Sequence, residues 1–242
     1  MRASVVGVHA ESVCLGPARV AWAPARRISD AIPLAALSGP DLLRLGELAP
    51  DLRNRFVVGR LLIHALVAGL FPAATEWAIH AGPCPRCGGL HAGVELEGVP
   101  AQASVSYAAD VVVVAVAPTS QVSRLGVDVE LGVADIGRVE DLRRMLGAST
   151  EPILRRWTRV QAVLKADGRG LLIDPGGVHL RRGGAWIAGQ AVSYAVTEVP
   201  GPPGCLVSLA WCSVAPAGAV PAQTGRRMTG AAGVRWNPRP LR

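Results

Sequence analysis

The stretch "WTRVQAVLKADGRGLL" (residues 157–172) contains Lys165, the only lysine among the 25 basic side chains of this 242-residue chain. Abundant Ala, Val, Gly and Arg are typical of a GC-rich coding bias, under which arginine is the default cation. A lysine retained under that bias indicates a role for a compact ammonium that can lose a proton. Helical spacing places Gln161 and Lys165 one turn apart on one face. The alternative interpretation is a cation that only complements the helix dipole.

A second informative stretch is "GVDVE" (residues 126–130). The alternation of a strand puts Asp128 and Glu130 on one face, with Val127 and Val129 on the other. Two carboxylates beside Gly126, which would leave room for a ligand, suit an octahedral Mg²⁺ that shares water and phosphate oxygens. A solvent-facing strand edge with two ordinary acids is an equally good interpretation.

The wider pattern predicts an α+β fold. Helical periods occupy residues 41–48, 51–70, 136–146 and 151–166, and strands are expected at 4–9, 13–22, 102–107, 110–117, 124–131, 170–174, 191–199 and 205–212. Each half thus offers a long helix and a small antiparallel sheet. We expect two pseudo-symmetric lobes, residues 1–120 and 121–215, with a cleft between them and a boundary near 118–123.

Charge and composition argue against a nucleic-acid-binding protein and a membrane protein. Five of the seven net positive charges are arginines of residues 216–242, a Pro/Gly/Arg-rich segment without acids that we interpret as a mobile tail. No helix or aromatic platform accompanies these arginines, so nucleic acid is not an expected partner. No signal peptide or membrane-spanning stretch is predicted. Five cysteines, an odd number, fit a reduced cytoplasmic protein better than a disulfide framework. We also expect the protein to be a monomer.

A possible zinc set lies in "HAGPCPRCGGLH" (residues 80–91). His80, Cys84, Cys87 and His91 have a compact ligand spacing within one loop. A free-thiol loop is the preferred interpretation, because no second pair of cysteines supports a zinc knuckle.

Six segments in order resemble the Sfp-type 4'-phosphopantetheinyl transferase superfamily. They are "RFVVGRLL" (55–62), "CPRCGGLH" (84–91), "SVSYAADVVVVAVA" (104–117), "GVDVE", "WTRVQAVLKADGRGL" (157–171) and a closing strand pair. The resemblance implies that coenzyme A lies in the cleft and that phosphopantetheine is moved with Mg²⁺ to a serine of an acyl or peptidyl carrier protein. It also implies metal ligation by Asp128 and Glu130 and cofactor binding by Arg60, Ser106 and Lys165.

The chain departs from the family pattern at the cofactor positions. Gln161 stands where the family has a glutamate that helps remove the serine proton, and Tyr107 stands where it has a histidine on the coenzyme A phosphates. Loss of a general base commonly costs about 10² to 10⁴ in rate. The family's loop near the adenine is here "HAGV" (91–94), without its cation or proline.

Three functional hypotheses follow. The first is an enzyme of polyketide or peptide natural-product biosynthesis whose coenzyme A and Mg²⁺ site is eroded. It would use Asp128, Glu130, Gln161, Lys165 and Tyr107 for acid-base chemistry on a pathway intermediate, with no cofactor. The second is a working phosphopantetheinyl transferase that uses coenzyme A and Mg²⁺. The third is a non-catalytic pseudoenzyme that binds a carrier protein.

Overall fold

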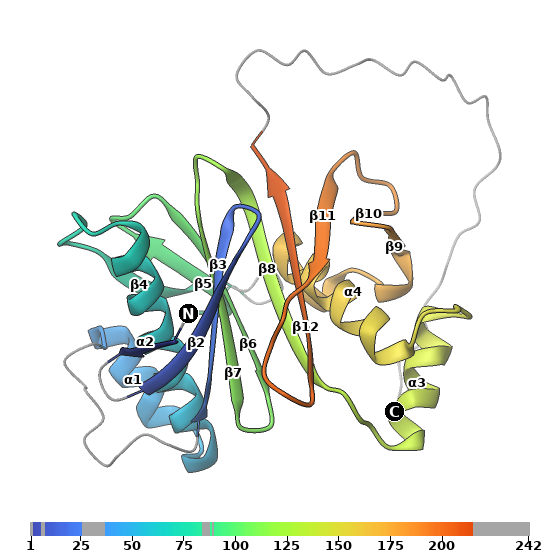
Figure 1. Ribbon diagram of the computed structural model, residues 1–242, viewed down its shortest axis with the longest axis horizontal. Coiled ribbons are helices and arrows are strands. Elements are labelled where there is room, and N and C mark those ends of the chain that lie inside the picture. The colour runs from blue at the N-terminus through green and yellow to red at the C-terminus, as the bar shows by residue number, and fades with distance from the viewer. Residues whose placement is uncertain (1, 6–7, 26–36, 84–87, 89, 215–242) are drawn as a thin grey trace.

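A computed structural model describes residues 2–5, 8–25, 37–83, 88 and 90–214. This part of the chain is a mixed α+β structure in which every strand pairing is antiparallel (Figure 1). Its helices are α1 (Gly39–Glu47), α2 (Pro50–Leu70), α3 (Ile136–Leu146) and α4 (Ile153–Asp167). The α+β class predicted from the sequence is confirmed.

The N-terminal half forms a five-stranded sheet in the order β1-β2-β3-β7-β6. Its strands are β1 (Arg2–Val5), β2 (Val8–Leu15), β3 (Ala18–Pro24), β6 (Ala101–Ala108) and β7 (Val111–Pro118), and a separate hairpin is formed by β4 (Ala78–Pro83) and β5 (Leu90–Glu97). Helix α2 covers one face of this sheet, and Leu62 and Val58 are fully buried against residues such as Val114.

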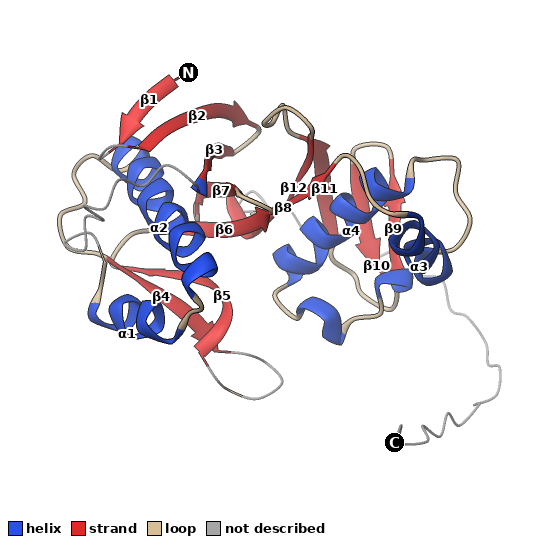
Figure 2. Ribbon diagram, turned by 90° about the horizontal axis from the view of Figure 1, so that it is seen from below, coloured by secondary structure: helices blue, strands red, loops and turns tan. Residues whose placement is uncertain are grey.

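The C-terminal half forms a second five-stranded sheet in the order β8-β12-β11-β10-β9. Its strands are β8 (Val122–Leu131), β9 (Val178–Arg181), β10 (Gly184–Ile187), β11 (Ser193–Glu198) and β12 (Cys205–Ser213). Helix α4 packs on this sheet through side chains such as Val163 and Leu164, which meet Tyr194 and Ala210 in a buried cluster. Figure 2 shows α2 and α4 well apart, with β6 and β8 between them.

The two sheets meet at a junction between β6 and β8, which are edge strands of their own sheets. A core of valines, including Val113 and Val127, fills the space between the sheets. The backbone N–H groups of Val127 and Val129 donate to the hydroxyls of Ser104 (3.0 Å) and Ser106 (3.2 Å) on β6. Serine hydroxyls of β6 therefore accept hydrogen bonds from backbone N–H groups at the edge of β8. Without these hydroxyls, the N–H groups would be unpaired.

Several local predictions were wrong. Residues 13–22 form two strands, because the chain turns at Gly16, whose φ is +53°. Part of the segment read as a loop around residues 80–94 is the β4 and β5 hairpin, and residues 170–174 include a short 3₁₀ helix rather than a strand. The hairpin of β9 and β10 was missed, since each strand has only four residues and weak alternation.

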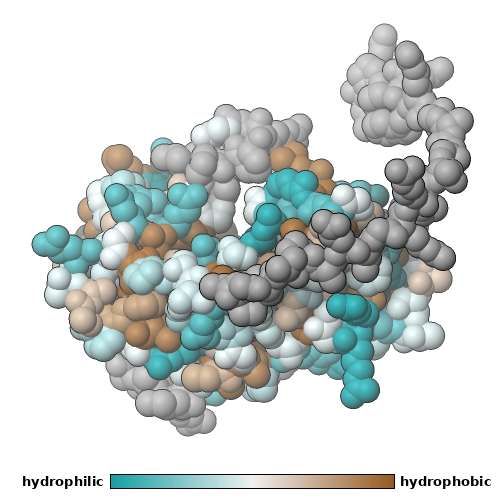
Figure 3. Space-filling model, turned by 90° about the horizontal axis from the view of Figure 1, so that it is seen from above, coloured by the Kyte–Doolittle hydropathy of each residue, from teal (hydrophilic) through white to brown (hydrophobic). Residues whose placement is uncertain are grey.

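In the described residues, no helix is long and apolar enough to cross a membrane. Figure 3 shows hydrophobic and hydrophilic residues interspersed over the face that it presents. The predicted tail of residues 216–242 lies outside the described residues.

Candidate functional site

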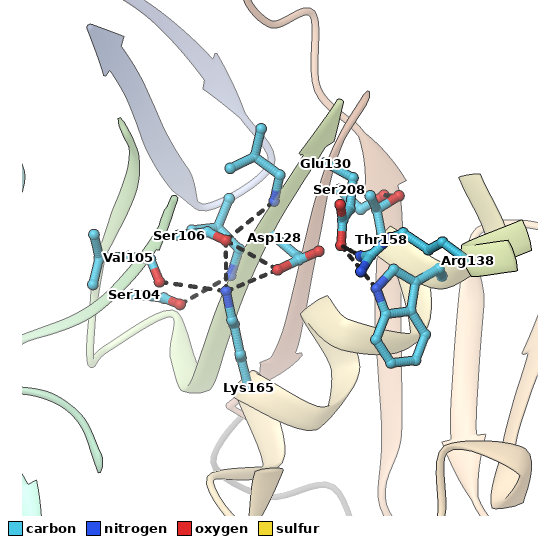
Figure 4. Close-up of polar contacts among 12 residues, drawn as sticks. Ser104, Val105, Ser106, Asp128, Glu130, Arg138, Thr158, Lys165 and Ser208 are labelled. Carbon is cyan, nitrogen blue, oxygen red and sulfur yellow. Dashed lines mark hydrogen bonds and ion pairs between the residues drawn. The ribbon is translucent and has the colours of Figure 1, made fainter. Parts of the chain in front are cut away.

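Lys165 reaches from α4 to the junction of the two sheets (Figure 4). Its Nζ donates to Ser106 Oγ at 2.6 Å and to Asp128 Oδ1 at 2.8 Å, and lies 3.5 Å from the carbonyl oxygen of Val105. The Ser106 hydroxyl donates in turn to Asp128 Oδ1 at 3.0 Å. Asp128 and Ser106 are buried, so the lone lysine neutralises a carboxylate that has little access to water.

Gly126 allows α4 to approach β8 closely enough for this contact. A Cβ on Gly126 would lie 2.1 Å from the carbonyl oxygen of Ala162 and 2.4 Å from the amide nitrogen of Ala166. The expectation that Gly126 leaves room for a ligand is therefore wrong, since helix backbone fills that space. The predicted alternation is confirmed, because Val127 and Val129 lie in the core between the sheets while Asp128 faces Lys165.

Glu130, the second expected metal ligand, is also engaged by the chain. The Trp157 indole Nε1 donates to Glu130 Oε1 at 2.9 Å, and the Arg138 guanidinium donates to the same oxygen. Arg138 lies in the first turn of α3, which begins after the Asp135 cap. Each of the two carboxylates therefore already has a cationic partner within the protein.

A cavity of about 700 Å³ lies beside these residues. Ser106, Tyr107, Asp128, Gln161 and Lys165 all line it, as does Glu130. Asp128 Oδ2 and Gln161 Nε2, on two of these residues, are buried atoms without a hydrogen-bond partner among the described residues. One can accept a hydrogen bond and the other can donate one. Buried groups without a partner are uncommon in folded proteins, and a bound water, ion or ligand is one explanation for them.

Tyr107 lies where this cavity meets a second one of about 560 Å³, since it lines both. Burial of its hydroxyl against α2 raises the pKa of the Tyr107 phenol, although the residue as a whole is 38% exposed, and the charges of Arg60 and Arg55 oppose that rise. The Gly59 side of α2 accommodates its hydroxyl, which would lie 3.1 Å from a Cβ at that position. Tyr107 is thus held neutral between the two cavities.

Arg60, an expected cofactor ligand, lines only the second cavity. Its Nε donates to Asp41 Oδ1 at 2.8 Å, both side chains are about 5% exposed, and its guanidinium lies over the Phe56 ring. This pair attaches α1 to α2. The structure therefore separates Arg60 from the cluster of Ser106, Asp128 and Lys165.

The two carboxylates that the family resemblance assigns to Mg²⁺ each have one oxygen bound by a cation of the chain: Asp128 Oδ1 binds Lys165 and Glu130 Oε1 binds Arg138. An Mg²⁺ ion takes carboxylate oxygens as ligands, so it would need the remaining oxygen of each carboxylate or would have to displace these cations. In the part of the chain that the structure describes, no three His, Cys, Asp or Glu residues are grouped as a metal site. Of the possible zinc set, Cys84, Cys87 and the His91 side chain lie outside the described residues, and His80 pairs with Glu97 at 2.9 Å.

Sequence reasoning missed a second polar cluster at the end of α4. The Asp167 side chain, fully buried, accepts hydrogen bonds from Arg169 and from the Tyr194 hydroxyl (2.9 Å), and Arg124 donates to it at 2.8 Å. Burial acts to raise the pKa of Asp167, but these hydrogen bonds and charges hold it below its ordinary value. The cluster fixes the end of the helix that carries Lys165, and only the succession of Asp167 and Arg169 hinted at it.

Neither models of known protein families nor curated proteins match this chain.

Proposed function

We propose that this chain is a diverged member of the phosphopantetheinyl transferase superfamily that acts in natural-product biosynthesis. Its two halves would correspond to the two lobes of that family. Its cavity would perform acid-base chemistry on an intermediate of low charge, in place of metal-dependent transfer from coenzyme A. One observation carries the proposal: the two carboxylates expected to hold Mg²⁺ are neutralised by Lys165 and by Arg138 with Trp157.

The pairing of acids with cations in the cavity lining favours an uncharged ligand. Each acid at its centre has an internal cation, and Lys165 directs its hydrogen bonds to Ser106 and Asp128. A bis-anionic phosphate group would have to separate Lys165 from Asp128 and leave a buried carboxylate without its counter-ion, which is costly. A neutral acyl or peptidyl group requires no such separation.

The chemistry would come from Asp128 Oδ2 and Gln161 Nε2, which have no partner among the described residues and which, being buried, would have to become accessible when the intermediate binds. Asp128 Oδ2 would take a proton from a carbon or oxygen of the intermediate and return it to the same molecule, so that no co-reactant is consumed. Lys165 and Ser106 hold the other carboxylate oxygen throughout. Gln161 Nε2 would donate to the carbonyl oxygen on which negative charge develops, as donors aimed at developing charge do in other enzymes.

The direct test is proton exchange. Acetyl N-acetylcysteamine thioester, a neutral acyl probe, is incubated with the full chain in D₂O, and deuterium uptake at the carbon next to the thioester carbonyl is followed by mass spectrometry. Catalysed uptake that is lost in Asp128→Asn, and retained in the matched surface change Asp141→Asn, is expected. Equal uptake by wild type and Asp128→Asn would contradict the role of Asp128.

A second measurement separates this proposal from surviving family activity. The chain is titrated with coenzyme A with and without Mg²⁺, and is then incubated with both and an apo carrier protein. We expect no tight metal-dependent binding and no phosphopantetheine adduct on the carrier. A phosphopantetheine adduct would establish the second hypothesis, a working transferase.

A further inference from the structure

Lys165 carries a nucleophilic group that the proton transfers described above do not use. It lines the cavity of about 700 Å³, its side chain is 31% exposed, and it is the only lysine of a chain whose other basic side chains are arginines. A primary amine can form a covalent bond with a carbonyl carbon, whereas a guanidinium keeps its charge and does not. This difference gives a reason for a lysine at this one position.

The neighbours of Lys165 form the arrangement that an amine nucleophile needs. Its Nζ lies 2.8 Å from Asp128 Oδ1, which can accept the proton that the ammonium has to lose before it reacts. Ser106 donates to the same carboxylate oxygen at 3.0 Å and accepts from Nζ at 2.6 Å, so it orients both groups. Activated nucleophiles share these parts: a proton acceptor within hydrogen-bond distance and a third group that orients the acceptor.

We propose that Lys165 forms a Schiff base with a ketone or aldehyde group of the pathway intermediate. Ketones and aldehydes are the carbonyl compounds that condense reversibly with a lysine amine. The inference rests on the proposed function and names its substrate class. The intermediate is uncharged and has a free carbonyl group, as a β-ketoacyl chain does, rather than being a simple acyl thioester or amide.

The overall exchange balances in atoms and in charge. The Nζ lone pair forms the bond to the carbonyl carbon, and the carbonyl oxygen leaves as water with the electrons of its former bonds to carbon. Two of the three ammonium hydrogens leave with that water, one of them by way of Asp128 Oδ1, and the third stays on the iminium nitrogen. The nitrogen therefore carries one positive charge before and after the exchange, and the buried Asp128 carboxylate keeps its counter-ion.

The Schiff base also supports the proton transfer proposed for Asp128. An iminium group withdraws electrons from the neighbouring carbon, so a hydrogen there is far more acidic than one beside a thioester alone. Asp128 Oδ2 takes that proton, and the electron pair of the C–H bond forms the enamine. The nitrogen and the carboxylate lose their charges together, so neither is left charged without the other. Return of the proton and attack by water on the iminium carbon release the product and restore Lys165.

The experiment traps the Schiff base by reduction. The full chain is incubated with acetoacetyl N-acetylcysteamine thioester and sodium cyanoborohydride, which reduces an iminium group to a stable amine, and the modified peptide is identified by mass spectrometry. We expect the adduct on Lys165, and none there with butanoyl N-acetylcysteamine thioester, which has the same chain length but no ketone. Lys165→Arg keeps the cation beside Asp128 and should lose the adduct. Circular dichroism confirms that this variant is folded.

Arg144→Lys supplies a matched amine outside the cavity. The Arg144 side chain lies on α3 and is 75% exposed, so a lysine there reports the reactivity of an ordinary surface amine. In this variant, labelling at Lys165 should be at least about tenfold faster than labelling at position 144, because the cavity holds the carbonyl group beside the amine. The rate at Lys165 should also saturate with probe concentration, while the rate at position 144 should rise in proportion to it.

Three results would overturn the inference: no adduct at Lys165, labelling at Lys165 no faster than at position 144, or equal labelling of Lys165 by both probes. The proposed function fails separately. Asp128-dependent deuterium uptake by the acetyl probe without an adduct on Lys165 would leave that function in place and remove the Schiff base. An adduct on Lys165 together with equal uptake by wild type and Asp128→Asn would remove the proposed role of Asp128 and leave the Schiff base.

Discussion

Lys165 Nζ lies 2.8 Å from Asp128 Oδ1, and this ion pair joins helix α4 to the edge strand β8. A second ion pair, between Arg124 and Asp167, joins the same two elements near the end of the helix. The Lys165 ammonium also donates to Ser106 on the other sheet. This one side chain therefore links α4, on which it lies, to two other elements, β6 and β8, at the point where the sheets meet.

Lys165→Met should destabilise the protein by about 1 to 3 kcal/mol, because it leaves the buried Asp128 carboxylate without its cation. This loss of unfolding free energy is smaller than that expected for a fully buried ion pair, since the Lys165 side chain is 31% exposed. Urea unfolding measures the change. The double variant Lys165→Met, Asp128→Asn should be less destabilised than the sum of the single changes, and strict additivity would show that the pair does not interact.

Gly126→Ala should destabilise the protein by more than about 3 kcal/mol, since overpacking against helix backbone cannot be relieved by a rotamer change. The added methyl group would overlap the Ala162 carbonyl oxygen. Thermal and urea unfolding provide the measurement. Gly46→Ala, in open space within α1, should instead raise stability by about 0.5 to 1 kcal/mol through helix propensity. Similar effects of both changes would contradict the close approach of α4 to β8.

Stability should fall at acid pH through Asp167. Its folded-state pKa is held below the ordinary value of 3.8, so its contribution is present above that value and is lost as pH falls through the folded pKa. The stability gap between wild type and Asp167→Asn should therefore be constant between about pH 7 and about pH 5 and should shrink below about pH 4. Urea midpoints across this range test it. Asp141→Asn, on the surface of α3, serves as control, and a gap that widens in acid would refute the assignment.

The two tyrosines should titrate late in the folded protein. Burial and the hydrogen bond to Asp167 raise the pKa of Tyr194 from 10.0 to about 12, and burial raises that of Tyr107. Near-ultraviolet absorbance should show no full phenolate step at pH 10 until the chain unfolds. Because the unfolded phenols ionise first, stability should be lost as pH rises from 10 toward 12, and Tyr194→Phe should reduce that loss. Ordinary titration of Tyr194 in the folded state would contradict its burial, since this residue is only 2% exposed.

The sequence predicted the elements that carry long, regular patterns. The helix period around Lys165 and the alternation of residues 126–130 locate α4 and β8 closely, and the residue types of β7 mark it as a buried strand. These features are local, so the spacing along the chain is sufficient to find them. Short strands such as β9 and β10 depend on partners supplied by the fold and have no comparable pattern.

The sequence grouped residues that line one cavity, but it did not show their hydrogen-bond partners. Ser106, Tyr107, Asp128, Gln161 and Lys165 do line one cavity. Nothing in the sequence showed that Arg138 and Trp157 would bind Glu130, or that Asp41 would bind Arg60, because these partners come from distant positions. Gly126 was assigned the opposite role, since a strand pattern cannot show which neighbour occupies the space above a glycine.

The serine hydroxyls at the junction have one further consequence. The amide protons of Val127 and Val129 are held by side chains of β6 rather than by a neighbouring backbone. Ser104→Ala would remove the acceptor of Val127, while the bond from Val129 to Ser106 and both β-sheet ladders would remain. The contact between the two sheets can therefore be weakened by removing a single oxygen atom, without breaking a backbone hydrogen bond of either sheet.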